Sequence, residues 1–281
     1  MAPEERDVIP GRRRSRAVAS GDASGAAGLV VEDVVSGYRG APSVVHDMSL
    51  SVAPGEVVAV LGRNGAGKTT LLSTISGVLR CRRGRVTLGD RQLSGMPAPR
   101  IAAAGVAHVP EGRRVIPGMS VDDNLRLGGY SLRSRTLIEE QLRSVIGLFP
   151  MLEPWRRRVA GSLSGGEQQM LAIARGLMGK PRVVLLDEPL TGLAPILRAE
   201  VLGVVDAMRT AGHAILIVEQ NAAETLPFAD RVLVIHEGRI TLSGSAAEMA
   251  SSSAIQEEYL GLPIGRMAGE PCPTREESRR W

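Results

Sequence analysis

A glycine-rich loop follows an apolar run early in this sequence. After the run Val57–Leu61 come, in order, Gly62, Arg63, Asn64, Gly65, Ala66, Gly67, Lys68, Thr69 and Thr70. Glycines let the backbone point successive N–H groups at phosphate oxygens, and a helix that begins at about Lys68 adds its positive dipole end. Lys68 supplies a compact charge between β- and γ-phosphates, for binding and for catalysis, and the Thr69 hydroxyl is placed to bind Mg²⁺. The loop therefore predicts a site for a nucleoside triphosphate with Mg²⁺.

Lysine is rare in this chain, which makes Lys68 informative. Only Lys68 and Lys180 are lysines among 34 basic residues, so arginine serves at almost every other positive position. A planar guanidinium does not fit a phosphate cradle as a point charge does. The alternative is a glycine-rich turn that matches the pattern by accident. Lys180 precedes Pro181 in an expected loop, and we interpret it as a solvated surface charge.

Two adjacent carboxylates follow a second apolar run. Val183–Leu186 is typical of a buried strand, and Asp187 and Glu188 then emerge at the carboxyl edge of the sheet, where α/β proteins bind ligands. Phosphoryl transfer needs a positioned water and neutralised charge more than covalent help. We therefore assign Asp187 to Mg²⁺ and Glu188 to the general base. The alternative is a turn with two solvated acids.

A third segment combines a hydroxyl with two glycines at the expected start of a helix. Ser164, Gly165 and Gly166 precede the helical run Met170–Met178. Such a segment forms a second nest of N–H groups for an anion, with Ser164 as a hydroxyl donor. The alternative is an ordinary helix N-cap without a ligand.

The elements that must hold these residues follow from hydrophobic periodicity. Short runs apolar on both faces favour an α/β fold with a covered parallel sheet, whereas residues 29–35 and 44–52 alternate and predict strands of a smaller antiparallel layer. Residues from about 120 to 178 have helical spacing instead, which predicts a helical subdomain inserted between strands, at about 112–178. The runs are Val57–Leu61, Val183–Leu186, Ala214–Val218 and Val232–Ile235, and the expected helical stripe is Leu137, Ile138, Leu142, Val145 and Ile146.

Composition is that of an ordinary globular protein of 281 residues, 43% hydrophobic and 23% charged. The net charge of +4 is too small to indicate a nucleic-acid partner. Cys81 and Cys272 lie far apart and indicate neither a disulfide framework nor a zinc site. No apolar run reaches the length of about 18 residues that a membrane span needs. We expect a basic, disordered tail over 1–28, one catalytic domain over 29–263 and a flexible tail over 264–281.

The segment Leu163–Gln169 resembles the signature sequence of the ATP-binding-cassette (ABC) ATPases in residues and in position, and the resemblance runs from about Leu29 to Leu262. It implies a P-loop NTPase fold with a RecA-like core, a small antiparallel β subdomain and an inserted helical subdomain. It also implies ATP with Mg²⁺ and head-to-tail dimers, in which Ser164, Gly165 and Gly166 cap the γ-phosphate of the opposite subunit. Tyr38 matches the aromatic residue that stacks on adenine, although a surface tyrosine in a turn is the alternative.

Three positions depart from the general ABC pattern. Glu111 stands where most members have a glutamine, in the loop that senses Mg²⁺ and couples to a permease, so the resemblance places it at the metal. Ala194 stands where the family usually has aspartate. Gln220 occupies the catalytic switch position that histidine usually holds, and His213 lies too early to replace it. A glutamine can hydrogen-bond a γ-phosphate and a water but cannot shuttle a proton near neutral pH.

Three short sequences together resemble one subfamily, the LivF-type ATP-binding subunits of bacterial branched-chain amino acid importers. They are Val-Pro-Glu-Gly-Arg-Arg at 109–114, Gly-Leu-Ala-Pro at 192–195 and Val-Glu-Gln-Asn at 218–221. The resemblance implies a non-identical ABC ATPase partner, two integral membrane permease subunits, an extracytoplasmic solute-binding protein that acts through the permease, and a place at the cytoplasmic face of the membrane. Importers of urea, amides or other small polar solutes, and soluble non-transport ABC ATPases, are the alternatives.

Overall fold

The computed structural model of the protein describes residues 28–251. The two predicted tails lie outside the described residues, except for Gly28 at the end of the first, and so does Cys272. The predicted domain limits of 29 and 263 therefore stay predictions.

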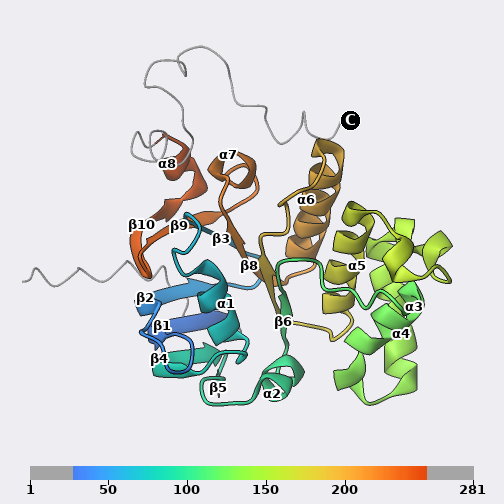
Figure 1. Ribbon diagram of the computed structural model, residues 1–281, viewed down its shortest axis with the longest axis horizontal. Coiled ribbons are helices and arrows are strands. Elements are labelled where there is room, and N and C mark those ends of the chain that lie inside the picture. Colours follow the sequence, from blue (N-terminus) through green and yellow to red (C-terminus); the bar gives the residue numbers. More distant parts are fainter. Residues whose placement is uncertain (1–27, 252–281) are drawn as a thin grey trace, which may run out of the picture.

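A six-stranded sheet forms the centre of the molecule (Figure 1). Five neighbouring strands run parallel, and the sixth, at one edge, pairs antiparallel with its neighbour. In spatial order the strands are β10 (Arg239–Ser245), β9 (Arg231–His236), β3 (Val57–Leu61), β8 (Ala214–Glu219), β7 (Val183–Asp187) and β6 (Val106–Val109).

The central strands β3, β7 and β8 are buried at every residue. Their apolar side chains point to both faces, so that helices must cover the sheet on both sides. This arrangement confirms the predicted α/β fold with a covered parallel sheet. The loops that leave the carboxyl ends of β3, β7 and β8 begin side by side at one edge, because these strands are neighbours and parallel.

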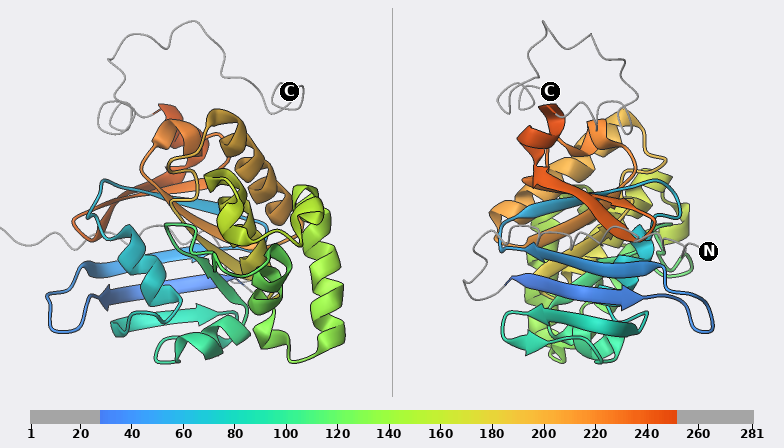
Figure 2. Two further views of the ribbon diagram at one scale, coloured as in Figure 1. Left: turned by 45° about the vertical axis from the view of Figure 1, so that its right-hand side comes forward. Right: turned by 90° about the vertical axis from the view of Figure 1, so that its left-hand side faces the viewer.

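A four-stranded antiparallel sheet lies beside the larger one (Figure 2). Its order is β2 (Val45–Val52), β1 (Leu29–Ser36), β4 (Cys81–Leu88) and β5 (Arg91–Gln92). The alternating pattern correctly predicted the first two strands. It gave no indication of β4 and β5, because four arginines and a glycine in Arg82–Arg85 and Arg91 hide the alternation of an exposed edge.

Helices cover the sheets and form a separate layer on the right in Figure 1. The helices α1, α2, α6 and α7 connect strands, and α8 follows β10. The helices α3, α4 and α5 with three 3₁₀ turns make up the layer between β6 and β7. The α-helices are α1 (Lys68–Ile75), α2 (Ala98–Ala103), α3 (Val121–Gly128), α4 (Arg135–Leu148), α5 (Gly165–Leu177), α6 (Pro195–Thr210), α7 (Ala222–Thr225) and α8 (Ala246–Ser251); the 3₁₀ turns are η1 (Tyr130–Leu132), η2 (Pro150–Trp155) and η3 (Ala160–Ser162).

The helical layer follows the predicted spacing with one difference. On α4, Leu142 and Val145 are buried, and Ile138 and Ile146 pack against the same core. Leu137, which we placed on the same stripe, is 39% exposed because it lies near the start of the helix, at the edge of the packed face. The limits of 112 and 178 for a helical subdomain remain a prediction.

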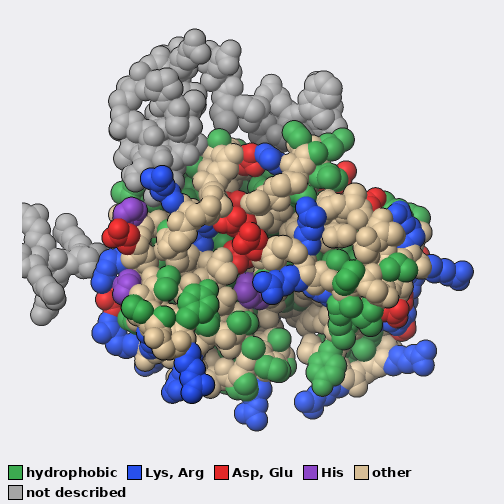
Figure 3. Space-filling view, in the orientation of Figure 1, with side chains coloured by type: hydrophobic (Ala, Val, Ile, Leu, Met, Phe, Trp, Pro, Cys, Tyr) green, Lys and Arg blue, Asp and Glu red, His purple; other side chains and the backbone are tan. Residues whose placement is uncertain are grey.

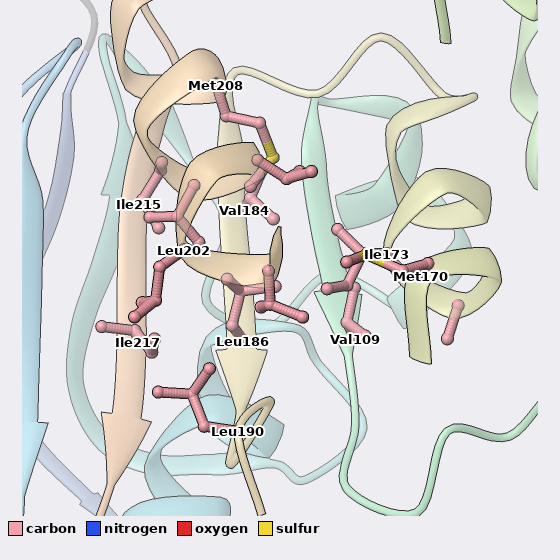
Figure 4. Close-up of a cluster of buried hydrophobic side chains, with 14 of the residues drawn as sticks. Val109, Met170, Ile173, Val184, Leu186, Leu190, Leu202, Met208, Ile215 and Ile217 are labelled. Atoms are coloured by element: carbon pink, nitrogen blue, oxygen red, sulfur yellow. The ribbon is translucent and has the colours of Figure 1, made fainter. Parts of the chain in front are cut away.

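Two hydrophobic clusters hold the layers together. In Figure 4, Met170 and Ile173 of α5 face Val109 of β6, while Leu202 and Met208 of α6 lie against β7 and β8. The second cluster lies between the two sheets and α1 and includes Leu71, Leu72 and Ile75. The carboxyl edge of the parallel strands is thus held from both faces by packed helices, which fixes where its loops begin.

Candidate functional site

The glycine-rich loop turns directly from β3 into α1. Gly65 and Gly67 have φ angles of 80° and 105°, which side chains rarely adopt, and α1 begins at Lys68. Lys68 is only 5% exposed, and its Nζ donates to the carbonyl oxygen of Gly62 at 2.9 Å. The first N–H groups of α1 therefore open onto the concave side of the loop, a geometry suited to a phosphate.

Asp187 lies at the end of β7, opposite the start of α1. Thr69 Oγ1 donates to Asp187 Oδ1 at 3.1 Å, and the residue is 1% exposed. Its Oδ2 is buried and has no hydrogen-bond partner among the described residues. Burial raises the pKa of Asp187 to about 6, against the hydrogen bond from Thr69, and the negative charges of Glu188 and Glu111 add to the rise. A buried carboxylate with an unused oxygen is a natural ligand for a cation.

Glu188 is the meeting point of three elements. Lys68 Nζ lies 3.1 Å from its Oε1, and Gln220 Nε2 donates to both of its oxygens, at 2.9 and 2.8 Å. Thr191 Oγ1 donates to Oε2 at 3.3 Å. The residue has a φ of 46°, a strained value for a glutamate, and this turns its side chain toward the loop. The structure thus brings together the three side chains that we predicted to be catalytic.

The predicted Mg²⁺ ligands fit that ion in part. Within residues 28–251, no three histidine, cysteine or acidic side chains lie close enough to hold a metal by themselves. Mg²⁺ usually takes only one or two carboxylates and fills its shell with phosphate oxygens and water. Thr69 and Asp187 suit that mode. Glu111 is exposed and acts on Asp187 only through its charge, so its place among the ligands stays a prediction.

Ser164 caps α5 and lies in a different part of the molecule from the loop 62–69. Its Oγ accepts the backbone N–H of Glu167 at 3.4 Å, and Glu167 Oε2 accepts that of Ser164 at 2.6 Å, so the two form a capping box. Ser164 is exposed, and the guanidinium of Arg113 lies against Gly165. An exposed hydroxyl at a helix N-terminus can donate to an anion that another molecule presents.

Tyr38 lies in the loop between β1 and β2 and is 51% exposed. The loop is held by Arg82 of β4, whose Nη2 donates to the carbonyl oxygens of Tyr38 and Ala41 at 2.6 and 2.8 Å. Its Nη1 donates to Ser43 Oγ at 3.1 Å. An exposed tyrosine on a fixed loop can stack on a base. Sequence reasoning missed Arg82, because nothing distinguishes it from the arginines beside it.

Two further side chains hold the loop 111–119, and sequence reasoning missed both. Asn124 of α3 is fully buried, accepts the N–H of Ile116 at 2.9 Å and donates to its carbonyl oxygen at 3.0 Å. Arg175 of α5 donates to the carbonyl oxygen of Arg114 at 2.7 Å. The loop that contains Glu111 is therefore tied to both α3 and α5.

A phosphate loop that opens onto α1, beside two carboxylates at the carboxyl edge of a parallel sheet, defines a P-loop nucleoside triphosphatase. The acidic side chains gather near the middle of the face in Figure 3. Residues 45–191 match the model of the ABC transporter family. The chain belongs to this family, and it is an ATP-binding, ATP-hydrolysing subunit.

Known relatives cover most of the chain. It is 41% identical over 229 residues to the high-affinity branched-chain amino acid transport ATP-binding protein BraG of Pseudomonas aeruginosa, covering 82% of this chain and 98% of that protein. It is 36% identical to the lipopolysaccharide export system ATP-binding protein LptB of Acidithiobacillus ferridurans, over 78% of this chain and 90% of that one. It is 30% identical to a probable branched-chain amino acid transport ATP-binding protein, LivF, of Archaeoglobus fulgidus, over 78% and 93%.

Solved structures support the same fold. The ADP conformation of MJ1267, an ATP-binding cassette of an ABC transporter, matches with a TM-score of 0.73 and 26% identity, covering 83% of this chain and 98% of that one. Of the helices that the structure describes, none combines the length and apolar character that crossing a membrane requires.

Proposed function

We propose that the chain is the ATP-hydrolysing subunit of a bacterial importer of branched-chain amino acids. The observation that carries this proposal is the 41% identity to BraG, which spans 98% of that protein. The sequence Val-Pro-Glu-Gly-Arg-Arg and the Gln220 switch position, which resemble the LivF-type subunits, support it.

Hydrolysis follows from the site residues. The N–H groups of loop 62–69 and Lys68 bind the β- and γ-phosphates, and Tyr38 stacks on the adenine. Thr69 and Asp187, with Glu111 as the third predicted ligand, would hold Mg²⁺, which would supply charge neutralisation at the phosphate oxygens. Glu188 polarises the attacking water and accepts its proton, while Gln220 orients that water against the γ-phosphate.

The contacts of Glu188 suggest how nucleotide prepares the base. Lys68 and Gln220 both contact the Glu188 carboxylate directly, at 3.1 Å and at 2.8–2.9 Å. A γ-phosphate attracts the same ammonium more strongly, because it carries more charge. Transfer of Lys68 from Glu188 to the phosphate then leaves the carboxylate free to bind water.

Partners follow from the same assignment. A non-identical ABC ATPase supplies its own Ser-Gly-Gly segment to the site of this chain, and receives Ser164, Gly165 and Gly166 in return. Two integral membrane permease subunits, fed by an extracytoplasmic solute-binding protein, hold the pair at the cytoplasmic face of the membrane. A cavity of about 660 Å³ lies in the described surface, and Ser120, the residue that follows loop 111–119, lines it. The other lining residues are Asp122, Asp123, Glu153, Pro154, Arg156 and Arg157. Because its walls are acidic and basic, a permease segment that docks there would have to present polar and charged side chains.

Two other transport functions are compatible with the site, because the solute never contacts this subunit. Importers of urea, amides or other small polar solutes are one alternative. Export is the other, which the 36% identity to LptB favours. Both would use the same ATP chemistry and differ only in the permease and its partners.

The test is co-expression of this chain with the neighbouring transport genes, followed by purification of any permease complex. ATP hydrolysis is then measured while the solute-binding protein is titrated with leucine, isoleucine, valine and urea. Leucine-stimulated hydrolysis, abolished by Glu188→Gln, supports the proposal. Stimulation by urea alone would move the assignment to the related importers, and a complex without any permease would contradict transport altogether.

A further inference from the structure

Glu219 ends β8 with a buried carboxylate to which the sequence assigned no role. The residue is 4% exposed and directly precedes Gln220. Because β8 pairs in parallel with β7, with Val218 opposite Asp187, Glu219 lies next to the point where the chain turns into Glu188. Its side chain therefore lies beneath the site rather than within it.

The Glu219 carboxylate accepts N–H groups from both loops that carry the catalytic side chains. The backbone N–H of Leu190, two residues after Glu188, donates to Glu219 Oε1 at 2.9 Å. The backbone N–H of Gln220 also donates to this carboxylate. The side chain of Leu190 lies beside Leu186 and Ile217, as Figure 4 shows, so the tied segment is also packed against the sheet.

A carboxylate in this place is costly, which argues against a purely structural reason for it. Burying an ionised group is unfavourable unless hydrogen bonds or an opposite charge compensate. Among residues 28–251 Glu219 forms no salt bridge, and the charges that act on it are those of Glu188 and Glu224. Burial raises its pKa to about 7, the charge of Glu188 adds to the rise, and the two N–H donors oppose it. A smaller or apolar residue at position 219 would lack the carboxylate that accepts these N–H groups.

We propose that Glu219 is a positioning residue for ATP hydrolysis, which holds the loop after Glu188 and the loop of Gln220 in one fixed relation. This inference rests on the proposed roles of Glu188 and Gln220 in catalysis. The two side chains come from different strands, yet Gln220 Nε2 lies within 2.9 Å of both Glu188 oxygens. A single carboxylate that binds both backbones sets that distance.

The expected consequence is a loss of rate without a loss of binding. A displacement of about 1 Å at a reacting group can cost about 100-fold in rate. ATP affinity, by contrast, depends on loop 62–69 and Tyr38, which Glu219 does not contact. A glutamine at 219 keeps one acceptor oxygen but turns an amide N–H₂ toward the second donor. A leucine removes both acceptors at similar volume.

The test compares the full-length chain with Glu219→Gln and Glu219→Leu in steady-state hydrolysis, with ATP affinity measured separately by a fluorescent ATP analogue. We expect kcat to fall about tenfold in Glu219→Gln and further in Glu219→Leu, with ATP Kd within about twofold of the parent. Glu237→Gln, an exposed turn residue, is the matched control and should retain full kcat. Melting of each variant shows whether the fold is intact.

Two results would overturn the proposal. The first is normal kcat in Glu219→Gln while Glu188→Gln is inactive, which leaves the catalytic assignment standing and removes only the role of Glu219. The second is a parallel fall in kcat, ATP affinity and melting temperature in Glu219→Gln, which marks a purely structural residue. Normal hydrolysis in Glu188→Gln would instead remove the catalytic assignment itself, and the Glu219 proposal with it.

Discussion

Catalysis at the residue scale depends on how Glu188 is held. Its left-handed φ of 46° is sustained by the Glu188 N–H donating to the carbonyl oxygen of Val218 at 3.0 Å, and by the ties to Lys68 and Gln220. Strain of this kind persists only when the surroundings fix the residue from several sides. Here a neighbouring strand, the phosphate loop and the switch position all do so. The proposed general base is therefore held in place by residues of the chain itself.

A pH-dependent stability is the first prediction at this scale, and it concerns Glu219. Folding raises its pKa from 4.5 to about 7, so the folded state binds the proton more tightly than the unfolded chain does. Its favourable contribution is complete below pH 4.5 and is lost as the pH rises through about 7. Glutamine does not titrate, so Glu219→Gln should match the parent near pH 4.5 and exceed its unfolding free energy by about 3 kcal/mol at pH 8.

Urea denaturation of parent and variant in nucleotide-free buffer, at several values between pH 4.5 and 8, measures the difference. Glu237→Gln is the control, because its carboxylate is exposed. A difference between Glu219→Gln and the parent that stayed constant with pH would contradict the prediction. If Glu219→Gln is more stable than the parent yet hydrolyses ATP more slowly, Glu219 contributes to catalysis while it destabilises the folded state.

Sequence reasoning found the candidate site residues that belong to a local sequence motif. Lys68, Asp187 and Glu188 follow apolar runs that mark strands, so their place at the sheet edge could be predicted. Glu219 could not be found in this way, because its partner Leu190 is 29 residues away and only the pairing of β7 with β8 brings them together. The sequence motif Val-Glu-Gln-Asn includes it but indicated no role for it.

At the scale of elements, loops carry the function and buried polar side chains hold the loops. Asn124 is fully buried and satisfies both backbone groups of Ile116 and the carbonyl oxygen of Ser120. Asn124→Ala leaves the N–H of Ile116 without its acceptor and opens a small void, whereas both carbonyl oxygens keep a backbone N–H donor. We expect a loss of about 3 kcal/mol in unfolding free energy. Urea denaturation measures it.

Asn221 provides the matched control for that loss. It is exposed and caps α7 by accepting the N–H of Ala223 at 3.0 Å. Asn221→Ala should cost only about 1 kcal/mol, as for other N-cap residues. Equal losses in the two variants would mean that burial of Asn124 adds nothing to its hydrogen bonds, contrary to the prediction.

The Tyr38 loop gives a second prediction at this scale. Arg82 binds it through two carbonyl oxygens and the Ser43 hydroxyl, a pattern that the planar guanidinium matches and a single ammonium does not. Arg82→Lys should therefore release the loop and raise the Kd for ATP about fivefold, the equivalent of one hydrogen bond, while kcat at saturating ATP is unchanged.

Arg85→Lys is the control for Arg82→Lys, because Arg85 lies on the same strand and forms only an exposed ion pair with Glu32 at 3.9 Å. Titration with a fluorescent ATP analogue should give the parent affinity for this variant. A fall in kcat with unchanged ATP affinity in Arg82→Lys would contradict the prediction. It would show that the Tyr38 loop affects hydrolysis rather than binding of the adenine.

The prediction of strands succeeded where burial leaves a clear pattern in the sequence and failed where most residues are exposed. Strands buried on both faces, such as β3 and β7, are unbroken apolar runs and cannot be mistaken for surface. The neighbouring strands β4 and β5 expose most of their residues, so their sequence carries almost no period. Cys81–Leu88 is a strand because β1 offers it a free edge, and β5 is a strand because it pairs with β4, so both causes are tertiary.

At the scale of the whole molecule, the two anion-binding segments belong to different layers. Loop 62–69 leads into α1 beside the two sheets, whereas Ser164 begins α5 in the helical layer (Figures 1 and 2). The sequence motifs predicted both segments but not the distance between them, which depends on how the helical layer packs on β6 and β7. In the described chain no hydrogen bond joins Ser164 to loop 62–69. A head-to-tail partner is what would bring such segments together.

A substitution at Ser164 tests whether this segment serves the site of a partner subunit rather than the site of its own chain. Ser164→Arg places a large cation at the start of α5, where it blocks approach of a phosphate held by the partner subunit. The chain's own phosphate loop is untouched, so its ATP affinity should equal that of the parent. In the assembled complex, hydrolysis should fall by at least half, because the site on the partner loses the segment that completes it.

Ser162→Arg is the matched control, since Ser162 is also exposed, lies two residues earlier and introduces the same charge. For both variants, ATP affinity is measured on the isolated chain. ATP hydrolysis is measured on the complex after its size has been verified. Loss of ATP binding by the isolated Ser164→Arg chain would mean that Ser164 serves its own site, and normal hydrolysis by its complex would mean that it serves neither. Only the combination of intact binding and impaired complex hydrolysis, absent from Ser162→Arg, is consistent with one site built from two chains.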